Sequence, residues 1–158
     1  MKPQYSIRRA VLADLERIGQ VEAASFGAEA YDRKLFAHYL RRCGPLFLVV
    51  TRRNTAVGYM ITCLRGGPAR QAAELVSVAV DPSMRQAGAA SALLESTLRR
   101  LRRRGATRLR LVVRVTNAPA QAFYEKYGFR RVRVLRGYYE DGGDGIAMSR
   151  PVERVRND

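Results

Sequence analysis

The feature that most constrains the fold is a nearly continuous apolar segment over residues 75–80, with the sequence LVSVAV. A strand that is apolar at both odd and even positions is typical of burial on both faces of a sheet. The pair Asp81-Pro82 ends the segment, because proline has no amide hydrogen to donate to a strand ladder. We therefore expect a central strand here, in a sheet that carries helices on its faces.

Strand and helix patterns alternate around this central segment. Continuous or alternating apolar residues predict six further strands, over residues 5–7, 46–50, 56–64, 108–114, 129–135 and 145–148. Apolar residues at helical spacing predict four helices, over 11–21, from about 32 to Gly44, from 90 to Gly105 and from about 117 to Gly128. This order predicts an α/β chain of the mixed α+β kind with a mostly antiparallel sheet. Because no repeat or linker divides the 158 residues, we expect one domain over 1–158.

Several classes of protein are excluded by the composition. No apolar run approaches the roughly 20 residues that a membrane-spanning helix needs, and the segment Met1–Tyr5 lacks the order of a secretory signal. We therefore expect a cytoplasmic protein with no membrane partner. Cys43, Cys63 and the single histidine, His38, are too few for a structural zinc site or a disulfide framework. We expect no metal, no redox chemistry, and two cysteines that are plain structural residues.

The charge balance is strongly basic. A net charge of +15, from 29 basic and 14 acidic residues, favours anionic partners such as ribosomes, nucleic acid or a polyphosphate-bearing ligand. A compositional bias toward arginine explains the same number, and both explanations stay open. The arginine-rich run over 99–104 lies on the solvated side of an amphipathic helix, opposite Leu94, Leu98 and Leu101. Because no RNA-binding aromatic motif accompanies it, we expect no specific nucleic acid and only a loose electrostatic association with the ribosome.

The loop after the central strand is made of small residues and leads directly into a helix. The helix start presents unpaired backbone N–H groups and the positive end of the helix dipole, which suit a pyrophosphate. Side chains larger than alanine would obstruct close approach. The residues of this turn are Arg85, Gln86, Ala87, Gly88, Ala89 and Ala90.

The second half of the chain resembles the GNAT acetyltransferase superfamily. The resemblance rests on the segment 73–82, on Arg85-x-x-Gly88-x-Ala90, on Asn117 followed by Ala120 and Tyr124, and on the segment 124–129, YEKYGF. Two further segments, 136–139 (RGYY) and 144–148 (DGIAM), are similar to the RimI-type ribosomal-protein-alanine N-acetyltransferases and related protein N-terminal acetyltransferases. The match runs from about residue 7 to 150. It implies the GNAT fold: a mixed seven-stranded sheet, about four helices, and a splay between the two central parallel strands.

The resemblance implies acetyl-CoA as cosubstrate and assigns residues to it. The pantetheine would hydrogen-bond the backbone of Val78, Ala79 and Val80, and the pyrophosphate would lie on the N–H groups of the turn that begins at Arg85, from Gln86 to Ala90. Asn117 matches the family asparagine that contacts the cofactor. Tyr124 matches the tyrosine near the thioester sulfur, where a phenol can give a proton to the departing thiolate.

The general base is less clear from the motifs. RimI-type enzymes usually carry a glutamate at the position of Val112, and valine cannot take a proton. Glu74, at the start of the central strand, is the favoured candidate and would act through water. Glu29, in a Glu-x-Tyr loop, is the second candidate, and water alone is the third. The structural alternative for Glu74 is a strand-end carboxylate that faces solvent or pairs with an arginine.

The same resemblance places substrate contacts at Glu29, Tyr31, Tyr138 and Tyr139. It implies acetylation of a protein N-terminus, such as that of a ribosomal protein. An α-amine with a pKa of about 7.7 to 8.0 is partly neutral at pH 7, whereas a lysine amine at about 10.4 is almost fully charged, which favours the N-terminal substrate. Two alternatives remain: acetylation of a small-molecule amine, and a catalytically silent module that binds CoA or associates with the ribosome.

Overall fold

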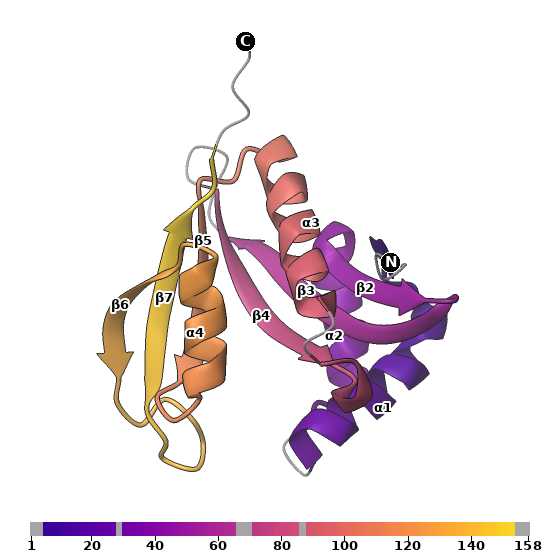
Figure 1. Cartoon of the computed structure of the whole chain (residues 1–158), viewed down its shortest axis with the longest axis horizontal. Helices are drawn as coiled ribbons and strands as arrows, with labels where there is room; N and C mark the ends of the chain where they lie inside the picture. Colours follow the sequence, from indigo (N-terminus) through magenta and orange to yellow (C-terminus); the bar gives the residue numbers. More distant parts are fainter. Residues whose placement is uncertain (1–4, 28–29, 66–70, 86–87, 154–158) are drawn as a thin grey trace.

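A computed structural model describes residues 5–27, 30–65, 71–85 and 88–153. In these parts of the chain the strands form one seven-stranded sheet in the order β1-β2-β3-β4-β5-β7-β6 (Figure 1). The strands are β1 (Tyr5–Arg9), β2 (Phe47–Arg52), β3 (Thr55–Arg65), β4 (Ala72–Val80), β5 (Arg108–Arg114), β6 (Arg130–Leu135) and β7 (Gly145–Pro151). The α-helices are α1 (Leu15–Phe26), α2 (Arg33–Cys43), α3 (Ala89–Arg103) and α4 (Ala118–Lys126).

Only the β4–β5 pair of this sheet is parallel; the other neighbouring strands in the described residues pair antiparallel. The predicted mixed, mostly antiparallel sheet with four helices is therefore confirmed, and β4 is its fourth strand, with three strands on either side. None of the described helices combines the length and apolar composition needed to cross a membrane.

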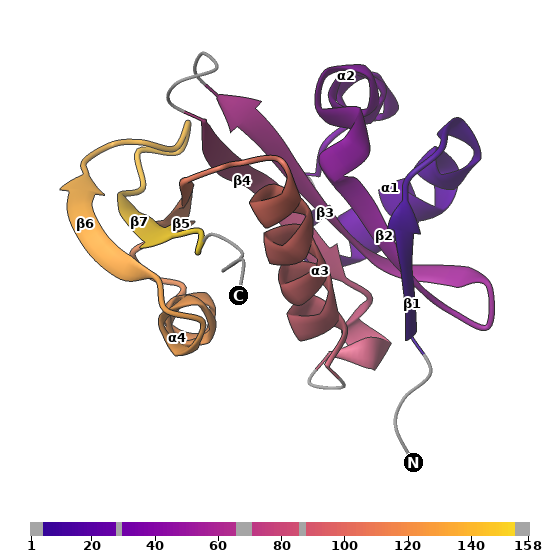
Figure 2. The same cartoon turned by 90° about the horizontal axis from the view of Figure 1, so that it is seen from above.

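Helices cover both faces of the sheet, with α1 and α2 on one side and α3 and α4 on the other (Figure 2). Successive side chains of β2 point to opposite faces of the sheet, so this one strand contributes to the core on both faces. Leu48 and Val50 pack in the core beneath α3, while Phe47 and Val49 pack in the core beneath α1 and α2. The nearly continuous apolar character of the inner strands follows from burial on both faces.

The two parallel strands separate soon after they meet. Their pairing covers only Ala72–Glu74 of β4 against Arg108–Arg110 of β5, and Figure 1 shows the strands close at one end and apart at the other. A β-bulge contributes, since Ile61 pairs with Ser77 but the next residue of β3 pairs with Leu75. An extra residue on one strand bends it and increases its twist. This divergence is the predicted splay.

Two predicted helix boundaries were wrong by several residues. The first helix was expected over 11–21, but a short 3₁₀ turn over Leu12–Asp14 comes first and α1 runs on to Phe26. Asp14 holds this turn, because its carboxylate accepts the Val11 N–H at 2.8 Å and pairs with Arg8 at 2.7 Å. The pairing with Arg8 also lowers the pKa of the Asp14 carboxyl.

The prediction for the cysteines was also wrong, because Cys43 and Cys63 form a disulfide. Cys43 ends α2 and Cys63 lies on β3, with 4.8 Å between their Cα atoms, within the range that a disulfide spans. The bond fastens the end of α2 to the sheet. Two cysteines 20 residues apart gave no sign of this pairing, since it depends on how α2 packs across β3.

Reduction of this disulfide should lower the melting temperature. In the chain-entropy treatment, a disulfide that closes a loop of this length contributes about 3 kcal/mol to the free energy of unfolding. Losing this contribution corresponds to a drop in melting temperature of roughly 6–12 °C for a protein of this size. Both sulfurs are buried, so the protein should be refolded with or without reductant before calorimetry. The double variant Cys43→Ala/Cys63→Ala should melt at the same temperature in both conditions. A parent protein insensitive to reductant would contradict the prediction.

Candidate active site

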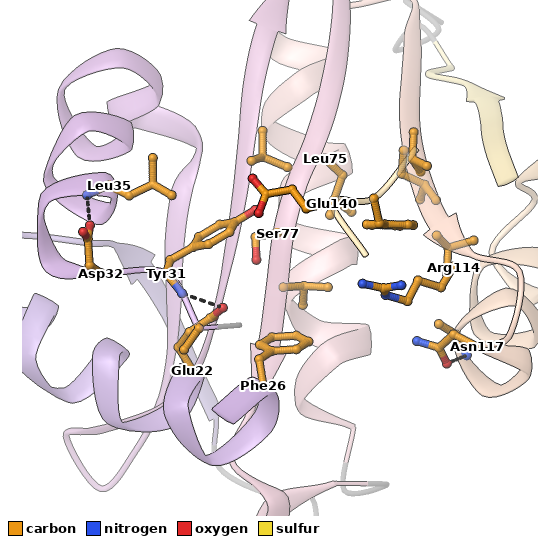
Figure 3. Close-up of a pocket in the computed structure, with 18 of the residues that line it drawn as sticks. Glu22, Phe26, Tyr31, Asp32, Leu35, Leu75, Ser77, Arg114, Asn117 and Glu140 are labelled. Atoms are coloured by element: carbon orange, nitrogen blue, oxygen red, sulfur yellow. Dashed lines mark hydrogen bonds between the residues drawn. The ribbon is translucent and has the colours of Figure 1, made fainter. Parts of the chain in front are cut away.

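A cleft of about 1130 Å³ opens where β4 and β5 diverge. Its facing walls are residues 75–78 of β4 and residues 111–114 of β5, and α1, α2, α4 and the loop after β6 complete it (Figure 3). The parallel strands have exchanged their last ladder hydrogen bonds at Glu74, so the cleft begins at the next residue. Val112 lines the cleft, at the point where the family resemblance leads one to expect a glutamate.

The start of α4 is fixed to the end of β5 by two amide side chains. The Asn117 side-chain oxygen accepts the Ala120 N–H at 3.2 Å and caps the helix. Gln121 Nε2 donates to the carbonyl oxygens of Arg114 and Val115, at 3.0 and 2.8 Å. These contacts hold Asn117 and Tyr124 at the cleft, where both line its wall.

Tyr124 is almost completely buried, with 6% of its surface exposed. Its ring lies edge-on to Phe123 and to Phe129, with centroids 5.4 Å away in each case. Burial, with a smaller contribution from Tyr139, raises the pKa of the phenol to about 12. Tyr124 therefore keeps its proton at neutral pH and can act as a hydrogen-bond donor into the cleft.

The predicted cofactor turn lies between β4 and α3. Gly88 caps α3 with a φ of 89°, in the left-handed region that favours glycine. Arg85 Nη2 donates to Ser25 Oγ at 3.4 Å, while Gln86 and Ala87 lie outside the described residues. Of the predicted pantetheine segment, Val78 lines the cleft, and Val80 and Ala79 follow on the same strand. Ala89 is buried and Ala90 half-buried in the first turn of α3.

Glu74 is not among the described residues that line the cleft. Its carboxylate pairs with Arg65 at 3.0 Å, and both side chains are partly exposed. The residue lies where β4 and β5 are still paired, opposite Arg110. The structure thus gives Glu74 the strand-end ion pair that was its structural alternative. Its role as base stays a prediction that this position disfavours, and Glu29 lies outside the described residues.

A different carboxylate, Glu22 of α1, borders the cleft. Only 2% of its surface is exposed, and it accepts hydrogen bonds from the Tyr59 hydroxyl and from the Tyr31 N–H. Burial raises the pKa of Glu22, while the two hydrogen bonds act in the opposite direction. Sequence reasoning missed this residue, although its spacing from Leu15 and Ile18 puts it on the apolar face of α1.

The tyrosines predicted at the substrate side lie on both sides of the cleft. Tyr31 packs against Phe36, with ring centroids 5.8 Å apart, and lines the cleft from the α1–α2 side. Tyr139 lines it from the loop before β7, with the Arg114 guanidinium 4.0 Å above its ring. Tyr138 is 51% exposed and is not among the described lining residues, but its ring lies edge-on to Tyr139.

The cleft carries more carboxylates than a chain of net charge +15 would lead one to expect. Its described lining includes Glu22, Asp32, Glu140 and Asp141, together with Lys34, His38 and Arg114. Figure 3 shows Glu22 and Tyr31 on one side, with Arg114 and Asn117 on the other. Arg114 pairs with Asp141 at 3.1 Å. Carboxylates at the cleft attract a cationic amine, and Tyr31 and Tyr139 line it from opposite sides.

Comparison with known proteins agrees with this geometry. The family model described as "Acetyltransferase (GNAT) family" matches residues 12–129. The chain is 32% identical over 157 residues to an N-alpha-acetyltransferase of Saccharolobus solfataricus, covering 94% of this chain and 93% of that protein.

Two solved structures extend the similarity to the fold. The ribosomal-protein-S18-alanine N-acetyltransferase from Escherichia coli aligns with a TM-score of 0.81 and 29% identity, covering 98% of each chain. A chain of the NatB acetyltransferase complex bound to CoA and MES aligns with a TM-score of 0.80 and 27% identity, covering 94% of this chain and 99% of that one. The chain therefore belongs to the acetyltransferase (GNAT) family, and the enzyme class predicted from its motifs is confirmed.

Proposed function

We propose that the protein, as one domain over residues 1–158, transfers the acetyl group of acetyl-CoA to the N-terminal α-amine of a protein. The observation that carries the proposal is the cleft between β4 and β5, which is lined from both faces of the sheet. A buried phenol, Tyr124, lies on the α4 side, and tyrosines and carboxylates line the α1–α2 side. The similarity to an N-alpha-acetyltransferase over nearly the whole chain supports this acceptor.

The residues on the β4–α3 side fit the cofactor. Beyond Glu74 the described ladder leaves the β5-facing edge of β4 without a strand partner, which suits the amide groups of pantetheine along Val78–Val80. The left-handed Gly88 starts α3 with its first N–H groups free of intrahelical partners, which suits the pyrophosphate. Asn117 and Tyr124 would then lie beside the thioester end of the cofactor.

In the reaction, the neutral amine attacks the thioester carbonyl in a ternary complex. The C–S bond breaks as the amide forms, and the nitrogen gives up one proton to solvent. The CoA sulfur leaves as a thiolate. A thiol has an ordinary pKa of about 8.5, below the value of about 12 for Tyr124. The phenol therefore stabilises the thiolate chiefly by donating a hydrogen bond, and solvent completes the protonation.

The cationic surface fits a loose association with the ribosome, which we propose as a secondary property in the cytoplasm. The buried Leu94, Leu98 and Leu101 face the core, and the arginines of the 99–104 run lie toward solvent. Burial lowers the pKa of Arg100, and neighbouring arginines lower it further. An anionic surface would relieve the repulsion among these arginines. Such an association should weaken steeply as salt concentration rises.

The proposed acceptor is tested by mass spectrometry of products from a peptide library and acetyl-CoA. Peptides with a free N-terminus should be acetylated at that amine, and N-terminally blocked peptides that contain lysine should not react. Small amines offered in parallel cover the main alternative. Transfer to a small amine and to no peptide would overturn the proposed acceptor, and CoA binding without any transfer would favour a silent module.

A further inference from the structure

A buried carboxylate that the reaction above does not use is connected to the cleft by two hydroxyl groups. Ser77 lines the cleft on β4, its Oγ lies 2.8 Å from the Tyr59 hydroxyl oxygen, and that hydroxyl donates to Glu22. We propose that Ser77, Tyr59 and Glu22 form a proton relay. The relay removes one proton from the ammonium group of the acceptor, and the neutral amine that results attacks the thioester. This inference rests on the proposed function, because it supplies the base for that reaction.

The fold brings these three groups together from three separate elements. Tyr59 of β3 pairs with Ala79 of β4, so Ser77 is its diagonal neighbour on the same face of the sheet. Helix α1 packs on that face and presents Glu22. The bulge in the β3–β4 ladder begins immediately before Ser77, at the edge of the splay. The serine hydroxyl therefore lies where β4 has just left β5.

The hydrogen-bond directions are set by counting protons. Tyr59 has one hydroxyl proton and donates it to Glu22. The hydrogen bond between Tyr59 and Ser77 must then run from the serine hydroxyl to the phenol oxygen. This arrangement leaves the lone pairs of Ser77 Oγ available to accept a proton from the cleft.

The transfer balances without any further reactant. One N–H bond of the ammonium breaks, and Ser77 Oγ gains that proton while passing its own to the Tyr59 oxygen. Tyr59 passes its proton to Glu22 Oε2, so the products are a neutral amine and a neutral carboxylic acid. Both hydroxyl groups end with one proton each. Glu22 borders the cleft, so it can release the proton to solvent there, and the hydroxyl groups rotate back.

The surroundings of Glu22 favour this role. Tyr59 is fully buried, and Tyr31 gives a second hydrogen bond through its N–H. Burial raises the pKa of Glu22, which makes its carboxylate a stronger base than an exposed one. Asp32, the N-cap of α2, lines the same cleft together with Lys34 and His38 of that helix.

The other described carboxylates of the cleft are engaged or exposed. Asp32 accepts the Leu35 N–H as the cap of α2, and Asp141 pairs with Arg114 and accepts the Gly143 N–H. Glu140 lies exposed in the loop before β7. Val112 has no proton-accepting group. Among the described residues that line the cleft, Glu22 is thus the buried carboxylate, and the hydrogen bonds from Ser77 through Tyr59 lead to it.

The test compares Ser77→Ala, Tyr59→Phe and Glu22→Gln with the parent on an N-terminal peptide under conditions where chemistry limits the rate. At pH 6.5 each variant should lose about 10- to 100-fold in kcat, at or below the low end of the range for general acid–base groups, because part of the α-amine is already neutral. The loss should shrink as the pH rises above about 8, where the free amine needs no base. Acetyl-CoA affinity should stay within twofold.

The control is Thr62→Val, which removes a buried hydroxyl of β3 that has no hydrogen-bond partner among the described residues. It should leave kcat unchanged at every pH. If Glu22→Gln fails to fold, Ser77→Ala still interrupts the relay at its half-buried end. Equal losses at all pH values, or full activity in Ser77→Ala and Tyr59→Phe, would overturn the relay alone. A parent that transfers no acetyl group would overturn the proposed function and the relay together.

Discussion

Tyr124→Phe should lower kcat by roughly 10²- to 10³-fold, the range typical of losing one hydrogen-bond donor to a developing negative charge. The substitution removes the hydroxyl group that we propose stabilises the leaving thiolate, and it leaves the ring in its packing between Phe123 and Phe129. Because the phenol of Tyr124 has a pKa of about 12, it remains a donor throughout the range in which the enzyme would be assayed. The rate should therefore show no loss from Tyr124 ionisation below about pH 11.

The matched control for this prediction is Tyr127→Phe. Tyr127 follows α4 by one residue, its ring lies 5.1 Å from that of Phe123, and it is not among the described residues of the cleft. It should keep the parental kcat. Isothermal titration calorimetry should give the same acetyl-CoA affinity for both variants and the parent. Equal kcat values for Tyr124→Phe and Tyr127→Phe would reduce Tyr124 to a packing residue.

The β4 and α4 walls of the cleft were predictable because their signals are local in the sequence. The apolar segment 75–80, the small-residue turn at Gly88 and the Asn117–Tyr124 spacing each describe one strand end or one helix start. Such features depend on residues that are neighbours in the sequence, so they can be recognised without knowledge of the tertiary packing. The positions of Asn117 and Tyr124 at the cleft follow from them.

The carboxylate candidates for the general base were not predictable in the same way. Glu74 was favoured because it lies at the start of the predicted central strand, but β4 begins at Ala72 and the sequence does not say at which residue β4 and β5 part. The separation begins after Glu74, which leaves this residue beside Arg65. Glu22 was missed because a charged residue in an amphipathic helix normally faces water. Its burial depends on Tyr59, a partner 37 residues away on another element.

The disulfide illustrates the same limit. Cys43 and Cys63 are close only because α2 packs across β3, a contact that local patterns do not encode. Two buried cysteines are compatible with free thiols as well as with a bond. The sequence therefore described the elements well and their side-to-side contacts poorly.

Gly88→Val should weaken acetyl-CoA binding by roughly 10- to 100-fold. The residue has a φ of 89°, and a β-branched side chain there carries strain of about 1–3 kcal/mol. No described atom lies within 4 Å of the position that a Cβ would take, so the substitution meets no steric clash with the described part of the protein. In the free protein the backbone at this position relaxes instead. Binding a pyrophosphate on the first N–H groups of α3 would restore the strained conformation, and the strain energy would reduce the binding free energy. About 1.4 kcal/mol is a factor of ten in affinity.

Gly105→Val separates this effect from the general cost of placing valine at a positive φ. Gly105 has a φ of 75°, also has no described atom within 4 Å of a Cβ, and lies beyond the opposite end of α3. Both variants should lose similar thermal stability, since each strains one backbone position. Only Gly88→Val should bind acetyl-CoA more weakly in calorimetry, because only Gly88 lies at the proposed pyrophosphate site. Equal affinities in the two variants would move the pyrophosphate away from the start of α3.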